Sequence, residues 1–237
     1  MPRLRHASEK TDGTNSRPSL FWSGVFDLGI STDCGVGGFR YFCLRKNQKQ
    51  NQTMTPEAAV TLATRYDEPC DMRADHASFF DGLLAVAAGP LNTATGERIR
   101  DYVMGWLDTH SLESFDRYSD RNYVRSYLGR SPQTHWEALV MSWKQGNRTT
   151  IHGHPAFAGY HFADGVFRVE IFEPAGEGRA RRIGEQIIDG REGLFAVGTP
   201  GRFDNHLHRI TCLSPTGHSL HVYSDDALRG ITFTETE

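Results

Sequence analysis

Between residues 55 and about 112 the hydrophobic positions recur three and four apart, which places them on one face of a helix. They include Leu83, Leu84, Val86 and Ala87 in one segment and Ile99, Tyr102, Val103, Trp106 and Leu107 in the next. The start of this region is typical of a capped helix, with Thr55 as N-cap and Pro56 in the first turn. The pattern predicts two or three helices here.

After Asp120 the pattern changes to short runs of β-branched and aromatic residues, separated by Gly, Pro and Asp. These runs are YVRSYL, EALVMSW, TTIHGH, GVFRVEIF, GLFAV, HRITCL, SLHVY and GITF. Because the helical segments precede the strands instead of alternating with them, a parallel βαβ sheet is disfavoured. We predict a mainly β fold, a sandwich or barrel over about residues 120–237 preceded by the helices.

Residues 1–53 are rich in Ser, Asn, Gln, Lys and Gly, and their last stretch, KNQKQNQT, has the composition of a solvated linker. We expect this segment to be a poorly ordered tail and residues 54–237 to form one domain. Met54 is an alternative start of the protein, because the helical pattern begins just after it.

The chain has 237 residues, with 26 basic and 29 acidic side chains and no basic block. That balance argues against a nucleic-acid partner. No apolar run approaches the roughly 20 residues that span a bilayer, and no signal-like segment opens the chain, so we expect a cytoplasmic protein without a membrane partner. The four cysteines are irregularly spaced, which favours reduced thiols over a disulfide framework.

The strongest chemical signal is the pair His152 and His154 within the run Ile151-His-Gly-His. Residues two apart on a strand point to the same face, so both imidazoles can bind one metal ion. Gly146 precedes the pair by six residues and Gly165 follows the next strand, so turns are expected on both sides of the strand that carries the pair. An isolated pair of this kind can also be a surface feature, since the chain has 11 histidines.

A second histidine segment follows about 50 residues later, with His206 and His208 again two apart. Beyond it, Ser219, His221 and Tyr223 alternate along one strand, so that their side chains can form a hydrogen-bonded row on one face. A strand with its polar face in water would show the same alternation.

Three motifs in this order, IHGH, LHRI and SLHVY, resemble the cysteine dioxygenase family of cupins. Upstream, Tyr123-Val-Arg125 is similar to the family's Tyr-x-Arg, and Trp143 lies nine residues before His152, as the family's tryptophan does. The resemblance covers about residues 120–225 and implies a cupin β-barrel, which is jelly-roll-like.

The resemblance implies that His152, His154 and His208 hold Fe(2+), an all-histidine form of the facial arrangement of non-haem iron oxygenases. His206 is the rival third ligand. Tyr223 would face the bound substrate, oriented by His221 and Ser219, and Arg125 with Tyr123 would bind the substrate carboxylate. These expected roles are implied by the positions of the residues in the motifs.

The implied reaction is the oxidation of L-cysteine by O2 to cysteine sulfinic acid, carried out by a monomer on a small thiol. One alternative is 3-mercaptopropionate as substrate, although its enzymes carry glutamine where Arg125 stands. Another is a cupin that binds a metal or ligand without turnover.

The match also fails at several points. Gly159 stands where some members have a cysteine that is cross-linked to the tyrosine, so we expect no thioether. Asp225 and Asp226 replace two prolines after Ser224, Cys212 lies near the place of an expected asparagine, and the segment from His154 to Gly165 is one residue short.

Overall fold

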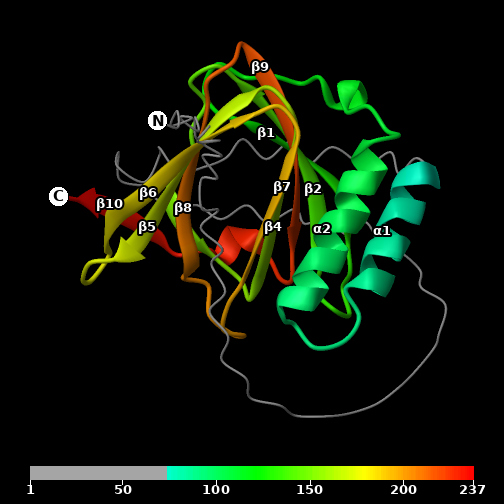
Figure 1. Ribbon diagram of the computed structural model, residues 1–237, viewed down its shortest axis with the longest axis horizontal. Coiled ribbons are helices and arrows are strands. Elements are labelled where there is room, and N and C mark those ends of the chain that lie inside the picture. Colours follow the sequence, from blue (N-terminus) through cyan, green and yellow to red (C-terminus); the bar gives the residue numbers. More distant parts are fainter. Residues whose placement is uncertain (1–73) are drawn as a thin grey trace, which may run out of the picture.

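The computed structural model describes residues 74–237, so the expected tail and the helix expected at Thr55 lie outside the described residues. Two helices, α1 (Ala74–Val86) and α2 (Thr93–Leu107), come first and are followed by strands (Figure 1). Two short 3-10 turns, η2 (Glu113–Phe115) and η3 (Ala227–Arg229), interrupt the connections. Among the described residues, no helix is both long and apolar enough to cross a bilayer.

The strands form two sheets that face each other. They are β1 (Val124–Arg130), β2 (Glu137–Lys144), β3 (Ile151–His154), β4 (Phe157–Asp164), β5 (Val166–Pro174), β6 (Arg179–Asp189), β7 (Glu192–Val197), β8 (Asn205–Cys212), β9 (Thr216–Tyr223) and β10 (Thr232–Thr236). The first sheet has the order β1-β2-β9-β4-β7, and the second is β10-β3-β8-β5-β6, closed through β10. From β2 to β9 this order is the double Greek key of a jelly roll, the class that includes the cupins. The expected mainly β, jelly-roll fold is confirmed.

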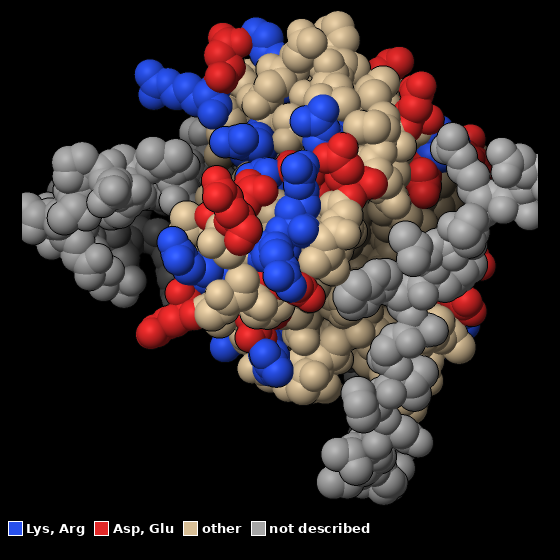
Figure 2. All heavy atoms as spheres, turned by 60° about the vertical axis from the view of Figure 1, so that its left-hand side comes forward, with Lys and Arg blue, Asp and Glu red and all other residues tan. Residues whose placement is uncertain are grey.

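Two strands lie outside the eight sequence-predicted runs, β4 and β6, although the sequence analysis did place a strand before Gly165. In β6 nearly every residue is exposed, and its charged side chains leave no apolar alternation to detect. Figure 2 shows both signs of charge interspersed over the side of the molecule where β5 and β6 lie. Ion pairs such as Arg209 with Glu170 (2.6 Å) and Arg182 with Glu185 (2.9 Å) account for this mixture.

Two hydrophobic layers hold the fold together. The helices cover the outer face of the first sheet, where Phe79, Leu83, Ile99 and Val103 are buried against strand residues such as Val140. A second cluster fills the space between the two sheets. The first sheet is therefore buried on both faces, which explains why all residues of β2 except Lys144 are buried and why its sequence is nearly continuously apolar.

Candidate metal centre and pocket

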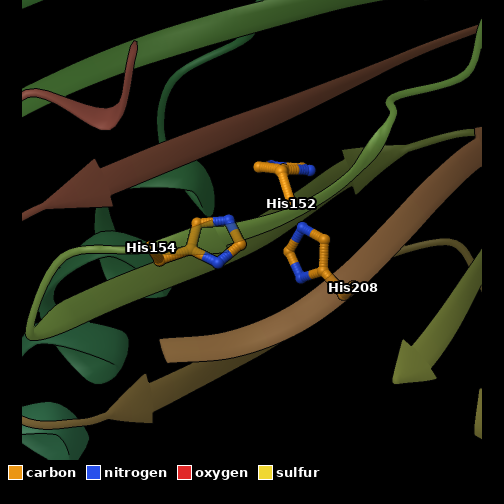
Figure 3. A group of neighbouring side chains, drawn as sticks. All are labelled: His152, His154 and His208. Carbon is orange, nitrogen blue, oxygen red and sulfur yellow. The ribbon is translucent and has the colours of Figure 1, made fainter. Parts of the chain in front are cut away.

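Three histidines from two neighbouring strands converge inside the barrel. His152 and His154 lie on β3 and His208 on β8, and ring nitrogens of all three lie within 4.8 Å of one another (Figure 3). His154 and His208 are buried, and His152 is half-buried. Among the described residues this is the one group of three or more potential ligands found so close together.

The pairing of β3 with β8 decides which histidine joins the pair. His152 lies opposite His208, but the register then shifts, and His154 lies opposite Asn205. The shift falls at His206, whose φ of 49° is in the left-handed region. His206 is thereby outside the cluster, and its backbone carbonyl instead accepts a hydrogen bond from Nδ1 of His154 at 3.1 Å.

Backbone acceptors also fix the tautomers of the pair. Nδ1 of His152 donates to the Thr150 carbonyl at 2.9 Å, as Nδ1 of His154 does to His206. The proton is then on Nδ1, and Nε2 offers its lone pair to the centre. Nε2 of His154 is buried, and it has no hydrogen-bond partner in the part of the chain that the structure describes.

Burial also keeps these rings neutral, which is the form that binds a metal. It lowers the pKa of His152, and it lowers the pKa values of His154 and His208 well below the ordinary value. Three neutral imidazoles suit zinc, copper, nickel or iron, and the orphaned Nε2 of His154 fits a metal ion.

A buried row of polar side chains lines the first sheet next to the histidines. The indole Nε1 of Trp143 donates to Oγ of Ser219 at 2.9 Å, Oγ of Ser219 contacts Nε2 of His221 at 2.7 Å, and Nδ1 of His221 contacts the hydroxyl of Tyr223 at 2.9 Å. All four residues are at most 2% exposed. Sequence spacing singled out Trp143, but nothing in the sequence indicated that it begins this row.

Arg125 and Tyr123 lie beside Tyr223 in one pocket, whose lining also includes Met141 and His152. Arg125 is 7% exposed, and its Nε and Nη2 have no hydrogen-bond partner among residues 74–237. These two nitrogens form one edge of the guanidinium. The Tyr123 ring packs against Trp143, with centroids 4.6 Å apart.

A buried carboxylate that the sequence analysis missed lies behind Arg125. Glu137 is 0% exposed, with Oε1 at 3.9 Å from Nη2 of Arg125 and Oε2 at 3.7 Å from Nε of Arg130. Its Oε1 accepts a hydrogen bond from the backbone N–H of Ala227 at 3.0 Å. Burial raises the pKa of Glu137, and the nearby Arg125 opposes that rise. An acidic residue at a strand start gave no sequence signal of this role.

The two aspartates that follow Ser224 hold the rim of the pocket. Asp226 caps η3 by accepting from the Leu228 N–H at 2.9 Å, and its other oxygen pairs with Arg130 at 3.0 Å. Asp225 pairs with Arg229 at 3.5 Å. Since Ala227 and Leu228 line the pocket, charged contacts shape this rim.

The strand register shows which residue of β4 lies beside Tyr223. Ala158, and not Gly159, lies opposite Tyr223 in the pairing of β4 with β9. A Cβ built on Gly159 would meet His161 at 2.8 Å, away from the row. Neither residue is a cysteine, so the absence of a thioether there still follows.

Tyr160 is a further residue that the sequence analysis did not select. Its ring packs edge-on against His208, with centroids 4.5 Å apart. Its buried hydroxyl has no hydrogen-bond partner within the described residues. Two other histidines stay outside the site. His161 is buried on the helix side of β4, and His218 pairs with Asp116 and Asp164 at 3.1 and 3.0 Å.

Comparison with known proteins adds little beyond the fold. No family model and no curated protein matches the chain. Similar solved structures include a cupin superfamily protein from Desulfitobacterium hafniense, at 12% identity over 48% of this chain and 88% of that one, with a TM-score of 0.37. A protein with a double-stranded beta-helix domain from Klebsiella pneumoniae shares 16% identity over 50% and 85%, with a TM-score of 0.36.

An oxalate decarboxylase variant from Bacillus subtilis shares 18% identity over 42% of this chain and 24% of that one, with a TM-score of 0.33. Likeness at these TM-scores carries no argument about activity. The fold rests on the strand order described above, and the function must be argued from the side chains.

Proposed function

We propose that this protein is an iron-dependent dioxygenase of small thiols, with L-cysteine as substrate and cysteine sulfinic acid as product. The observation that carries the proposal is the juxtaposition of two features. One is a cluster of three neutral histidines, of which His152 lines the pocket, and the other is an edge of Arg125 in the same pocket that makes no hydrogen bond to the described residues. The first suits a metal with open positions, and the second suits a substrate carboxylate.

In this proposal His152, His154 and His208 hold Fe(II). The bound metal would supply the oxygen chemistry and would favour the thiolate form of the substrate. The backbone carbonyls behind His152 and His154 support this role, because they direct both Nε2 lone pairs inward.

Arg125 would bind the substrate carboxylate through Nε and Nη2, which together match its two oxygens. A lysine has one nitrogen and could not reproduce both contacts. Burial of the pair strengthens the electrostatic attraction, since little water competes for the guanidinium. Tyr123 would close one side of this subsite.

Tyr223 would contact the substrate, because its hydroxyl ends the buried row and the residue lines the pocket. His221 and Ser219 would hold that phenol in place. Burial raises the pKa of Tyr223, so the phenol stays protonated and able to donate a hydrogen bond.

The carboxylate subsite also fits 3-mercaptopropionate, which is the alternative substrate; Arg125 favours cysteine in the family's pattern. A jelly roll that binds a metal without turnover is the alternative from another class. It would hold iron at the same histidines but consume no oxygen.

The decisive experiment is oxygen uptake by the Fe(II)-loaded protein with cysteine, cysteamine, homocysteine and 3-mercaptopropionate. We expect the highest kcat/KM with cysteine, with sulfinic acid formed in equal amount to the oxygen consumed. A matched pair of variants tests the ligands: His208→Asn should lose iron and activity, whereas His206→Asn, which tolerates the positive φ, should keep both. Iron binding without oxygen uptake for any thiol would support the non-catalytic alternative.

A further inference from the structure

The buried row has two ends of different chemistry. At one end stands Trp143, fully buried, with its Nε1 at 2.9 Å from Oγ of Ser219. At the other end stands Tyr223, which lines the pocket. Between them, each contact is 2.7 to 2.9 Å long, so each carries one proton between two heavy atoms.

The donor and acceptor roles along the row follow from the indole. Nε1 of tryptophan is only a donor, so Oγ of Ser219 must accept there. If His221 also donated to Oγ, the serine's own proton would be left without an acceptor, and among the described residues no other acceptor for it is found. The serine hydroxyl therefore donates to Nε2 of His221.

The same reasoning continues to the pocket. A neutral imidazole that accepts at Nε2 carries its proton on Nδ1. Nδ1 of His221 then donates to the hydroxyl oxygen of Tyr223 at 2.9 Å. The Tyr223 proton is left without an acceptor in the row, and it is free to donate to a group in the pocket.

We infer that Trp143 is a positioning residue which sets the tautomer of His221 and thereby makes Tyr223 a hydrogen-bond donor toward a ligand at the histidine cluster. The direction of the row stands on the contacts alone; its consequence for a bound thiol or oxygen rests on the proposed function. Without the indole N–H, the Ser219 proton can turn toward the side that the indole donor occupied, and Oγ of Ser219 can then accept from Nε2 of His221. Tyr223 can then donate inward to Nδ1, and the pocket loses its donor.

The tautomer can be read without turnover, by two-dimensional 15N NMR of the full chain labelled with 15N-histidine, metal-free and loaded with diamagnetic Zn(II). The His221 signals are assigned by their loss in His221→Gln. We expect a protonated Nδ1 and an unprotonated Nε2. A predominant Nε2–H tautomer, or protonation of both nitrogens at pH 7, would overturn the inference whatever the protein catalyses.

The role of the indole is tested by placing 3-benzothienylalanine at position 143, which replaces the N–H by sulfur and keeps the ring shape. The same replacement at Trp136, which is buried among the helix-side residues, is the matched control. At position 143 we expect a mixture of His221 tautomers and, in the Fe(II)-loaded protein, a fall of roughly tenfold in kcat/KM with cysteine. Iron content should not change.

Trp143→Phe serves as a second variant if the analogue is poorly incorporated, with the same expected tautomer shift. An unchanged His221 tautomer in either variant would overturn the positioning role. Should the tautomer shift while the native protein oxidises no thiol, the inference about the row survives and the proposed function fails, so the two outcomes are distinguishable.

Discussion

Arg125 is nearly buried, and its Nε and Nη2 make no hydrogen bonds to the described residues, an arrangement that costs free energy unless a ligand accepts from them. A ligand carboxylate would remove that cost. Arg125→Ala should lower kcat/KM with cysteine by roughly 30- to 1000-fold, the range expected for a charge-assisted pair in a partly dry pocket. Oxygen uptake at limiting and at saturating cysteine measures this fall in kcat/KM.

Two controls separate substrate binding from folding. Arg125→Lys keeps a positive charge near Glu137 but not the two-pronged edge, so it should also be impaired while melting near the native temperature. Cysteamine has no carboxylate, and its slow turnover should be almost the same in all three proteins. Native efficiency with cysteine in Arg125→Ala would show that the carboxylate binds elsewhere.

His161 makes a pH-dependent contribution to stability. Burial lowers the pKa of His161 to about 4, and its Nδ1 donates to the Leu220 carbonyl at 3.0 Å. The unfolded chain takes up this proton near pH 6.5 and the folded chain only near pH 4, so the contribution is complete above pH 6.5 and is lost as the pH falls toward 4.

The substitution His161→Asn removes this titration while keeping a donor near the Leu220 carbonyl. Between pH 6.5 and 4 the free energy of unfolding should fall less steeply than in the native protein, by up to about 1.4 kcal/mol per pH unit. Urea unfolding at several pH values measures the slope. Equal slopes in the two proteins would mean that the pKa of His161 is the same in the folded and the unfolded chain.

Helix α2 contains two glycines in different surroundings. A Cβ on Gly96 would lie 2.2 Å from Cε2 of Phe195 on β7, whereas a Cβ on Gly105 would meet nothing within 4 Å. Close approach of the helix to the sheet therefore requires glycine at only the first position. The pair separates helix propensity from packing within one element.

Gly105→Ala should raise the free energy of unfolding by about 0.5–1 kcal/mol, since alanine loses less backbone entropy in a helix. Gly96→Ala should lower it by about 1–3 kcal/mol, because the methyl group must displace the Phe195 ring or the helix. Thermal and urea denaturation compare both with the native chain. Stabilisation by both substitutions would mean that α2 packs less closely on β7.

The metal and the fold as a whole should be linked, because the three histidines come from β3 and β8 and converge only after these strands pair. A metal that binds the folded chain alone stabilises it by about 2.7 kcal/mol at a hundredfold excess over Kd. Removing iron with a chelator should therefore lower the melting temperature. In His208→Asn the same chelator should have little effect, and an unchanged melting temperature in the native protein would argue against a metal at these histidines.

Short-range features of this protein follow from its sequence. The three-to-four spacing predicted helices ahead of the β region, and α1 and α2 confirm it within the described residues. The alternation of a strand places His152 with His154, and Ser219 with Tyr223, on common faces, since neighbouring side chains in a strand point to opposite sides. The helices and the common faces of these strands depend only on backbone geometry within one element.

Contacts between distant strands were decided by the tertiary structure. The bulge at His206 leaves that residue outside the cluster and brings His208 in, and the register of β4 with β9 puts Ala158 opposite Tyr223. Glu137 behind Arg125 and the indole of Trp143 on Ser219 likewise join residues far apart in the chain or on different strands. A shift of one residue in strand pairing turns every side chain to the other face, and register is set by packing across the whole barrel, so no local pattern in the sequence specifies it.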